Sequence, residues 1–317
     1  MNKIRPSIAA LMPVRNASRF LGSSLGSISS NDEFLDEIII IDDGSTDASP
    51  IVLNEWARLN PKVRLLKTSG IGLVAALNLG MESVQSEFVA RFDADDIYHP
   101  RRLEIQSSAL KPGVVAVFSD YTIFSESGRS LGFIPSPIFP DETAVSLVRS
   151  QRTPHPSVVF SVDAARAVGG YRAEDFPAED LSLWLRLSRA GSLVTIPEFL
   201  LNYRISKSSI STMHSTAMFK KRLQLIEAIG LNPSAVSNCF QMLDSATNRY
   251  DKESNSEIRL LLHLIELKAA LQTLGLVGSS AGVVKSLVKE FLKPSSFKNT
   301  ASFALQTINR KILKNFL

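Results

Sequence analysis

Three carboxylates lie within four positions of the stretch RFDADDIYHP, residues 91–100: Asp93, Asp95 and Asp96. They follow the apolar residues FVA, which indicate a buried strand that ends here. Two carboxylates about 4 Å apart repel by roughly 4 kcal/mol at an effective dielectric constant near 20. A chain that only has to fold gains nothing from such a cluster, so a ligand for it has to be considered.

Oxygen ligands at this spacing suit a hard divalent cation, Mg²⁺ or Mn²⁺, which would cancel the repulsion and could hold a diphosphate. The open alternative is a solvated acidic loop. In either case Asp96 is expected to cap the helix that begins near HPRRLEIQ.

A second acidic stretch lies in IIIIDDGSTDAS, residues 38–49, where four isoleucines are followed by acidic and turn-forming residues. Asp42 or Asp43 could accept hydrogen bonds from a nucleobase or a ribose. The alternative is turn chemistry, because Asp, Gly, Ser and Thr form turns and caps without any ligand.

A third acidic pair, Glu179 and Asp180 in AEDLSLW, opens a helix, where the helix dipole favours ionised carboxylates. A positioned carboxylate can act as a general base, typically worth about 10²–10⁴-fold in rate. The alternative is a pair of ordinary helix N-terminal acids. His155, between two prolines in HPSVVF, could contact a phosphate or an acceptor, or could be a structural loop histidine.

The elements that must position these residues alternate along the first half of the chain. Strands are predicted in SIAALMPV, in EIIIIDDGS (37–45), in VRLLK and in EFVARFDADD, with helices between them in SRFLGSSLGSIS, SPIVLNEWARLN (49–60) and GLVAALNLGMESV. Ser49 is placed at the N-cap of the second helix. Such alternation favours a parallel sheet with helices on both faces, and ligands of such sheets lie outside the carboxyl ends of the strands. The DDGS and DADD segments are therefore expected to share one crevice.

The second half begins with a looser, proline-containing segment over residues 111–150. Strands are predicted at 114–124 and 155–161, and an amphipathic helix at 178–191 that ends at Gly191. After LLNYRISKSSIS (200–211) the pattern is purely helical, so a domain boundary is expected near residue 212.

Composition fits a globular protein of one large domain with an extension: 317 residues, 44% hydrophobic and 21% charged. The single cysteine, Cys239, allows no intrachain disulfide and suits a reducing compartment such as the cytoplasm. The N-terminus is interpreted as a first strand and not as a signal peptide. No apolar run reaches the roughly 18–20 residues that span a bilayer.

In their order and spacing these motifs resemble the bacterial family 2 glycosyltransferases with the GT-A fold. The matching segments cover about residues 7–211, two-thirds of the chain: MPVRNASRFLGSSLGSI, EIIIIDDGSTD, GIGLVAALNLGMESVQSEFVARFDADDIYHPRRLEIQ, HPSVVF, GGYR, AEDLSLWLRLSRAG and YRISKSSIS. The succession from ARFDADD through HPS to ED..LW.RL is similar to the branch that builds lipopolysaccharide, O-antigen and capsule glycans.

The resemblance implies a metal-dependent, inverting transfer of a hexosyl type from a nucleotide-diphosphate sugar, with UDP favoured. It places Pro13, Val14 and Arg15 beside the nucleobase. Asp43 would contact the base or ribose, Asp93 would lie near the ribose, and Asp95 would be the ligand of Mn²⁺ or Mg²⁺. Asp180 matches the catalytic base, with Glu179 beside it as an acceptor or orienting residue, and Gly169, Gly170 and Tyr171 match an acceptor-side loop.

One position departs from the family pattern. Relatives often carry a histidine three residues after the tyrosine of YR, which can complete the metal site, but Ser206 stands there. His214 or His155 could substitute for it, or water and nucleotide oxygens could fill the place.

The implied chemistry needs carboxylates at two places on opposite sides of the sugar. One would bind a cation and the other would act as the base. A sugar nucleotidyltransferase is a rival hypothesis, but MPVRNAS lacks the glycines of its phosphate loop. A catalytically silent binding subunit is a second rival, and the intact DADD and AED segments argue against it.

The C-terminal region carries the basic charge, with seven basic and one acidic residue over 281–317. The segment 256–276 is interpreted as an apolar helix packed on the catalytic domain. In the last segment apolar and basic residues fall on opposite helix faces: Leu305, Ile308, Ile312 and Phe316 against Arg310, Lys311 and Lys314. This pattern is typical of an interfacial helix on anionic lipid, and ordinary core packing under a basic face is the alternative.

The sequence therefore predicts a GT-A catalytic domain over 1–211 and a helical extension over 212–317. The expected partners are a nucleotide-sugar donor and a glycan or lipid-linked glycan acceptor, without nucleic acid. The expected location is the cytoplasm, with peripheral binding to the cytoplasmic face of the inner membrane left open.

Overall fold

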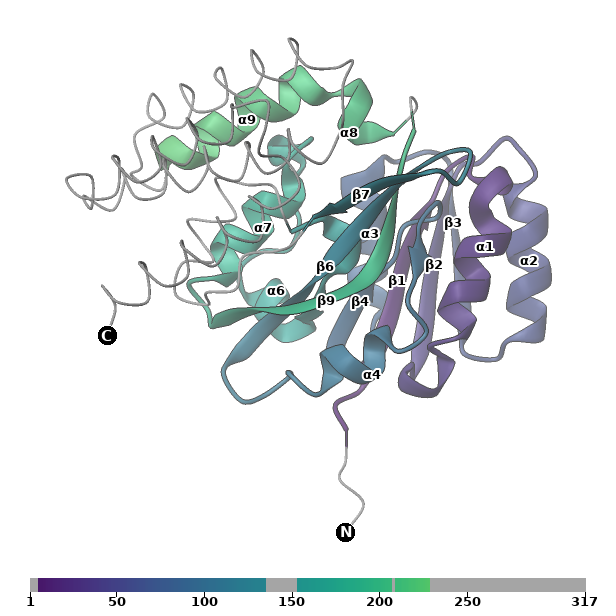
Figure 1. Ribbon diagram of the computed structural model, residues 1–317, viewed down its shortest axis with the longest axis horizontal. Coiled ribbons are helices and arrows are strands. Elements are labelled where there is room, and N and C mark those ends of the chain that lie inside the picture. The colour runs from purple at the N-terminus through teal and green to yellow at the C-terminus, as the bar shows by residue number, and fades with distance from the viewer. Residues whose placement is uncertain (1–4, 135–152, 207–208, 229–317) are drawn as a thin grey trace, which may run out of the picture. The chain divides into compact units, whose positions relative to one another are not determined.

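A computed structural model describes residues 5–134, 153–206 and 209–228 of the chain (Figure 1). In the first half the elements are β1 (Ile8–Val14), α1 (Ser18–Ser29), a 3₁₀ turn η1 (Asp32–Phe34), β2 (Glu37–Asp43), α2 (Ser49–Leu59), β3 (Val63–Thr68), α3 (Leu73–Ser83), β4 (Phe88–Arg91), β5 (Ile97–Tyr98) and α4 (Arg102–Ser107). The elements that follow are β6 (Val114–Ser125), β7 (Ser130–Ile134), η3 (His155–Ser157), β8 (Val159–Ser161), α6 (Val162–Ala167), η4 (Ala173–Asp175), α7 (Glu179–Leu187), β9 (Ser192–Ile205), α8 (Ile210–Met213) and α9 (Ser215–Ala228).

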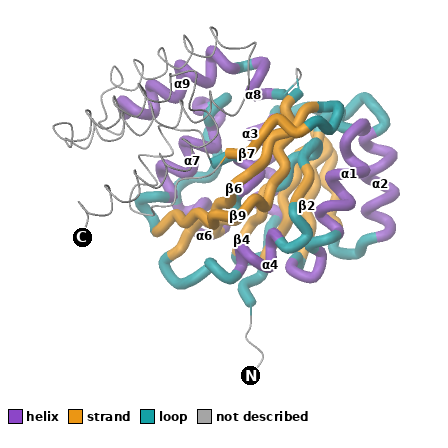
Figure 2. Tube along the Cα trace, in the orientation of Figure 1, coloured by secondary structure: helices purple, strands orange, loops and turns teal. Residues whose placement is uncertain are grey.

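The strands of the described residues form one mixed sheet in the order β3-β2-β1-β4-β8-β6-β9-β5, with β7 paired to β6 (Figure 2). The first four strands are parallel, with Leu11 of β1 level with Ile39 of β2 and Arg91 of β4. Strand β8 runs antiparallel to both β4 and β6, whereas β6 and β9 are parallel. The carboxyl ends of β1, β2 and β4 therefore lie at one edge of the sheet, and the acidic segments follow two of them.

Both faces of the parallel half are covered, which explains its continuous apolar runs. On one face Ala10 and Ile40 pack in a buried cluster with Leu21 of α1 and Leu53 of α2, and these two helices lie side by side in Figure 1. On the other face α3 approaches so closely that a Cβ on Gly80 would lie 2.3 Å from Leu11 and 2.7 Å from Ile41. A side chain at position 80 would push α3, and the loop before it, away from the sheet.

The beginnings of α1 and α2 are joined by one carboxylate. Asp47 accepts the backbone N–H of Ser18 at 3.0 Å and that of Ser49 at 2.9 Å. Ser49 is the first residue of α2 and its hydroxyl accepts the N–H of Ala17 at 2.9 Å, so its expected N-cap role is wrong. These contacts fix the loop that carries Arg15 against the loop that follows Asp43.

The segment PRRLEIQ, residues 100–106, connects the central strands of the sheet through buried side-chain hydrogen bonds. The buried guanidinium of Arg102 donates to the carbonyls of Arg91 and Val158, each at 3.0 Å. Gln106 donates to the carbonyls of Val117 and Ser157 at 3.0 and 2.8 Å. The motif thus fixes the strand end before the acidic cluster and the turn that carries His155.

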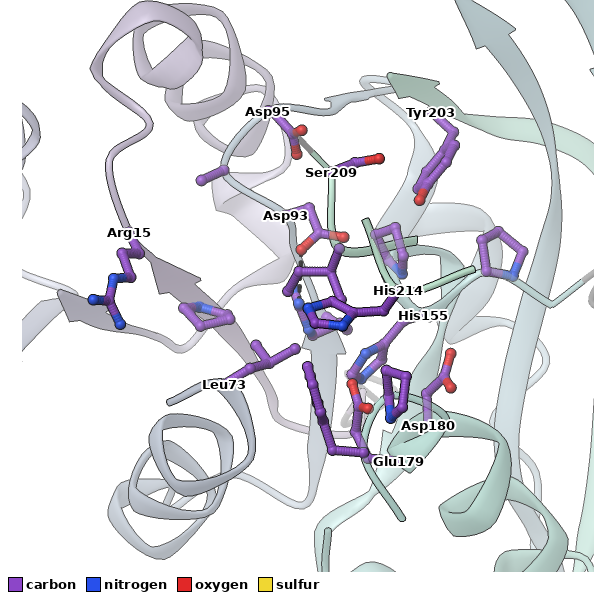
Figure 3. Close-up of a pocket in the computed structure, with 18 of the residues that line it drawn as sticks. Arg15, Leu73, Asp93, Asp95, His155, Glu179, Asp180, Tyr203, Ser209 and His214 are labelled. Carbon is purple, nitrogen blue, oxygen red and sulfur yellow. Dashed lines mark hydrogen bonds and ion pairs between the residues drawn. The ribbon is translucent and has the colours of Figure 1, made fainter. Parts of the chain in front are cut away.

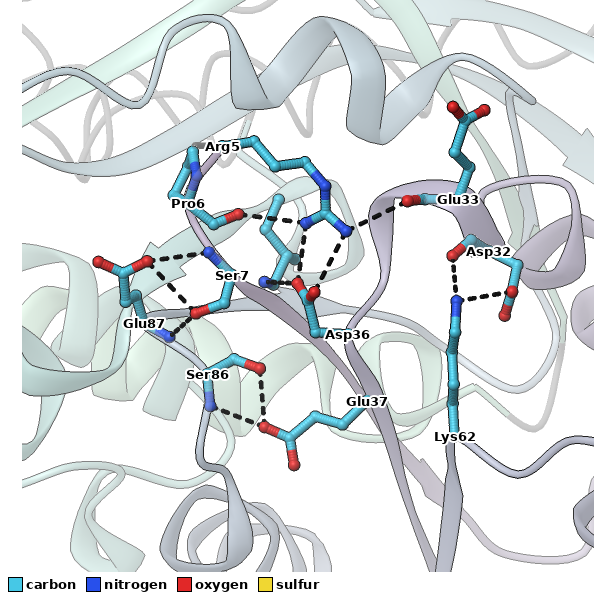
Figure 4. A network of polar contacts seen from close by, with 11 residues as sticks. Arg5, Pro6, Ser7, Asp32, Glu33, Asp36, Glu37, Lys62, Ser86 and Glu87 are labelled. Carbon is cyan, nitrogen blue, oxygen red and sulfur yellow. Dashed lines mark hydrogen bonds and ion pairs between the residues drawn. The ribbon is translucent and has the colours of Figure 1, made fainter. Parts of the chain in front are cut away.

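At the amino ends of the strands a polar network closes the opposite edge of the sheet (Figure 4). Asp36 accepts from Arg5 and from the N–H of Ile8, each at 2.8 Å. Glu37 accepts the N–H groups of Gln85 and Ser86 at 2.8 and 2.7 Å. Backbone groups left over at the strand ends are satisfied there without a ligand.

The predicted alternation of strands and helices in the first half is confirmed, and so is the strand at 114–124. Two boundaries differ. The strand expected over 155–161 is shortened to β8, because Pro154 accepts from the N–H and hydroxyl of Ser157 and forms a turn. Helix α7 ends at Leu187, since the N–H groups of Ala190 and Gly191 both return to the carbonyl of Leu187.

Contacts along the chain separate two units, residues 1–226 and 227–317. The boundary expected near residue 212 falls within α8, which belongs to the first unit. The predicted apolar helix at 256–276 and the predicted amphipathic C-terminal helix lie outside the described residues. No helix in the described part of the chain has the length and hydropathy of a membrane span.

Candidate active site

A cavity of about 650 Å³ opens at the carboxyl ends of β1, β2 and β4. Eleven of the twelve predicted site residues line it: Pro13, Val14, Arg15, Asp43, Asp93, Asp95, His155, Glu179, Asp180, Ser206 and His214. In Figure 3 Arg15 lies at one end and the pair Glu179 and Asp180 at the other, with Asp93 between them. The expected shared crevice of the DDGS and DADD segments is confirmed.

Asp43 organises the end of the cavity beside Arg15. Its carboxylate accepts the hydroxyl of Thr68 at 2.5 Å and the N–H groups of Ile71 and Gly72 at 2.7 and 2.9 Å. Burial alone would raise the pKa of Asp43. These hydrogen bonds and the charge of Arg15, 3.7 Å away, outweigh that effect, so the pKa of Asp43 lies below its usual value. Asp42 instead accepts the N–H of Ser45 at 3.1 Å, which is turn chemistry.

The three carboxylates of DADD have different surroundings. Asp93 forms an ion pair with Arg91 at 2.7 Å and keeps 28% of its side chain exposed to the cavity. Asp96 is 1% exposed, and its Oδ1 accepts the backbone N–H of Arg204 at 2.7 Å. Burial, and next the charges of Asp93 and Asp95, raise the pKa of Asp96 well above its usual value.

Asp96 is therefore not the cap of the following helix, contrary to expectation. The short strand β5 intervenes, and α4 begins only at Arg102 without a side-chain cap. Pairing of β5 with β9 brings the N–H of Arg204 to Asp96 instead.

Asp95 is the carboxylate best suited to a cation. It is partly buried and lines the cavity, and among the described residues no other residue donates a hydrogen bond to its carboxylate. Burial, and then the charge of Asp93, raise the pKa of Asp95 to about 6. Among the described residues no group of three His, Cys, Asp or Glu side chains could hold a metal. The residues fit a cation of the Mg²⁺ type, which commonly uses one or two carboxylates together with substrate phosphates.

Glu179 and Asp180 are the first two residues of α7, after the cis peptide bond between Phe176 and Pro177. Glu179 is 5% exposed and its Oε2 has no hydrogen-bond partner in the described part of the chain. Burial, and next the charge of Asp180, raise the pKa of Glu179 to about 8. Burial also raises the pKa of Asp180, while the N–H of Leu181 and the charge of Arg222 act against that shift. The raised pKa of Glu179 favours its protonated form, so the environment of the pair favours one negative charge over two.

His155 lies at the cavity wall with Nε2 2.7 Å from the hydroxyl of Tyr171, and its ring packs edge-on against Trp184. Burial, and then the charge of Arg91, hold the pKa of His155 well below its usual value, so the ring is neutral at pH 7. The side-chain amide of Asn78 in α3 fixes the backbone of Tyr171: it donates to the carbonyl of Tyr171 at 2.8 Å and accepts the N–H of Tyr171 at 3.0 Å. The GGYR turn and the HPS turn are thus locked together beside the acidic pair.

One face of α8 and α9 forms a further wall that the motifs did not identify. Residues four apart line the cavity: Ile210, His214, Met218 and Arg222. Ser206, the position where a histidine was expected, is 6% exposed and also lines it. Arg222 is 1% exposed, and the charge of Asp180 acts on its guanidinium. The spacing of four between these residues could have suggested that they share one helix face, but not that this face lines the cavity.

Comparisons with known proteins were made on sequence and on structure. The family model "Glycosyl transferase family 2" matches residues 9–146. An Escherichia coli protein named UDP-Gal:alpha-D-GlcNAc-diphosphoundecaprenol beta-1,3-galactosyltransferase is 32% identical over 218 residues, which cover 66% of this chain and 78% of that one. The amylovoran biosynthesis glycosyltransferase AmsE of Erwinia amylovora is 30% identical over 197 residues, covering 60% and 72%.

Solved structures show the same fold at low sequence identity. Staphylococcus aureus TarS in complex with UDP-GlcNAc has a TM-score of 0.58 at 13% identity and covers 85% of this chain and 80% of that one. The mannosyltransferase PcManGT of Pyrobaculum calidifontis, in complex with GDP-Man and Mn²⁺, has a TM-score of 0.52 at 16% identity, with coverage of 96% and 84%.

The α/β sheet with flanking helices is thus a GT-A-like fold, and the protein is a glycosyltransferase. The chain belongs to glycosyl transferase family 2, and it is homologous to bacterial enzymes of amylovoran and other polysaccharide biosynthesis. The resemblance seen in the sequence motifs is confirmed.

Proposed function

We propose that this protein transfers a sugar, with inversion, from a nucleotide-diphosphate donor to a glycan acceptor in bacterial surface polysaccharide biosynthesis. The main support is that two separate acidic pairs line one cavity. Asp93 and Asp95 follow the end of β4, and Glu179 and Asp180 begin α7. An in-line displacement needs a leaving-group site and a base on opposite sides of the reacting carbon.

The nucleotide is assigned to the end lined by Pro13, Val14 and Arg15. Asp43 would accept from the base or ribose, and its hydrogen bonds to the start of α3 hold it there before any ligand binds. Asp93 would accept from the ribose with the oxygen that Arg91 leaves available. Asp95 would hold Mn²⁺ or Mg²⁺, which when bound supplies positive charge to the departing diphosphate.

Asp180 is assigned as the base. Its ionised carboxylate would take the proton of an acceptor hydroxyl while that oxygen forms a bond to the anomeric carbon. The bond from that carbon to the diphosphate oxygen breaks, and the nucleoside diphosphate leaves with the electron pair. The raised pKa of Glu179 favours its protonated form, which can donate a hydrogen bond to an acceptor oxygen, and Arg222 opposes protonation of Asp180.

The substrate classes follow from the relatives. The E. coli relative is named for a UDP-galactose donor and a diphosphoundecaprenol-linked acceptor, so a UDP-sugar and a lipid-linked glycan are the favoured pair. Such an acceptor would bring the enzyme to the cytoplasmic face of the inner membrane.

The test is a screen of the purified protein with UDP- and GDP-sugars, Mn²⁺ and a lipid-diphosphate-linked N-acetylglucosamine acceptor. The readouts are nucleoside diphosphate release, product mass and the anomeric configuration of the product by NMR. Acceptor-dependent release with one donor and a product of the opposite anomeric configuration would support the proposal. Donor binding without any hydrolysis or transfer would favour a silent binding subunit instead.

A further inference from the structure

Arg204, in the YRIS segment of β9, makes an unusual set of contacts with the acidic cluster. The residue is 6% exposed and lies where β9 passes the loop of the three carboxylates. Its Nε donates to the backbone carbonyl of Asp95 at 2.6 Å. Its own backbone N–H donates to the carboxylate of Asp96 at 2.7 Å. Arg204 therefore contacts two consecutive residues of the loop, once with its side chain and once with its backbone.

The guanidinium is held between two aromatic rings. Its Cζ lies 4.3 Å from the ring centroid of Phe20 in α1 and 4.3 Å from that of Phe124 in β6. Cation–π contacts of this kind are strengthened when the cation is desolvated, as it is here. The two rings restrict the planar group to one orientation, so its hydrogen bond to Asp95 has a defined direction.

The side chain of Asp95 lacks such support of its own. Within the described residues no other residue donates a hydrogen bond to its carboxylate, and only its own backbone N–H acts on it, whereas Asp43 accepts three hydrogen bonds from other residues and Asp93 has an ion pair with Arg91. The direction in which Asp95 points therefore depends on its backbone. Arg204 fixes that backbone at the carbonyl of Asp95, and Asp96 anchors the next residue.

We propose that Arg204 is a positioning residue that fixes Asp95 toward a divalent cation accompanying the donor diphosphate. The inference rests on the proposed function, in which Asp95 is the cation ligand. It gives the YR segment a role in the site although the position after it, Ser206, is not the histidine that relatives carry. Residues that orient metal ligands typically change metal affinity by about 10–100-fold when they are replaced.

The test measures Mn²⁺ affinity of the intact protein by the electron paramagnetic resonance signal of free Mn²⁺, with UDP and, in a parallel series, GDP. Arg204→Met should weaken Mn²⁺ binding in the presence of nucleotide at least tenfold. Arg204→Lys, which keeps the charge but not the planar group, should fall between this variant and the parent. Phe124→Leu removes one ring from outside the cavity lining and should also weaken binding, by a smaller factor.

Arg166→Met is the control, because this guanidinium also donates to two backbone carbonyls, of Met81 at 2.7 Å and Val84 at 3.0 Å, but does not line the cavity. It should leave Mn²⁺ affinity unchanged whatever it does to the melting temperature. Parent-like Mn²⁺ affinity in folded Arg204→Met, or in both Arg204→Lys and Phe124→Leu if Arg204→Met does not fold, would overturn the proposal.

Asp95→Ala separates this inference from the function on which it rests. If Asp95→Ala loses Mn²⁺ binding while the Arg204 variants keep it, only the positioning role is wrong. If Asp95→Ala binds Mn²⁺ with nucleotide as tightly as the parent, the cation assignment itself fails, and the positioning role fails with it.

Discussion

The guanidinium of Arg91 lies 2.7 Å from the carboxylate of Asp93, at the inner end of the acidic cluster. Arg91 is almost fully buried, with 2% of its side chain exposed, and Asp93 keeps 28%. The buried cation of Arg91 thus compensates part of the charge of the three acids, and burial together with the charges of Asp93 and Asp95 raises the pKa of Asp96, which favours its neutral form. Arg91 therefore offsets part of the repulsion within the cluster, and a bound cation would offset more of it.

Replacing Arg91 should destabilise the protein. Arg91→Met leaves Asp93 beside two further acids without a counter-charge, and breaking a buried pair typically costs about 3–5 kcal/mol, less here because Asp93 is partly exposed. We expect a loss of about 2–4 kcal/mol in the free energy of unfolding, measured by urea denaturation at pH 7. Arg101→Met, which removes an exposed ion pair with Glu104, is the control and should have a much smaller effect. Equal stabilities of the two variants would contradict the assigned role of Arg91.

The pH dependence of transfer should report on Arg222. The groups that act on Asp180 are Glu179 beside it, the N–H of Leu181, and the guanidinium groups of Arg222 and Arg91. A base works only when ionised, so the rate should rise with pH through the raised pKa of Asp180. Because Arg222 lowers that pKa, Arg222→Gln should move the acidic limb of the kcat profile to higher pH.

Arg222→Lys should keep the limb near its original position, since the charge is retained. The measurement is kcat against pH at saturating donor and acceptor for the parent and both variants. An acidic limb that stays in place in Arg222→Gln, with kcat lowered equally at every pH, would mean that Arg222 only supports the structure.

Asp47 should contribute to stability in a pH-dependent way. Burial pushes its pKa upward, but hydrogen bonds from Ser49 and Ser18 outweigh this, so the pKa lies well below its usual value of 3.8. A depressed carboxyl pKa adds stability above the unfolded-state pKa and loses it as the pH falls toward the folded-state value. Asp47→Ala should cost about 1 kcal/mol at pH 7, as for a lost helix cap on an exposed residue.

The difference between Asp47→Ala and the parent should shrink as the pH falls below about 4, which chemical denaturation at several pH values can measure. A constant difference between pH 7 and pH 3 would show that the charge of Asp47 does not matter.

Much of the site could be predicted because strand ends fix it. Asp43 and Asp93 each follow a continuous apolar strand, and parallel strands bring their carboxyl ends to one edge, so both reach the same cavity. Glu179 and Asp180 were found through the motif alone, since no local signal brings α7 to that edge.

The buried arginines of the site could not be predicted. The fold buries Arg91, Arg204 and Arg222. The sequence around an arginine does not show whether its side chain is buried, and most arginines are exposed. Asp96 was misplaced because the two-residue strand β5 has too few residues to show a pattern. Its pairing with β9, more than 100 positions away, decides what Asp96 contacts.

The central claim is that Asp180 is the base of a sugar transfer at this cavity, and Asp180→Asn tests it most directly. The side chain keeps its size while losing its ability to take a proton, so donor affinity should stay within a few-fold of the parent. The rate constant kcat for transfer from the donor identified in the screen should fall by about 10²–10⁴-fold. A near-normal kcat in Asp180→Asn, with donor binding intact, would contradict the account.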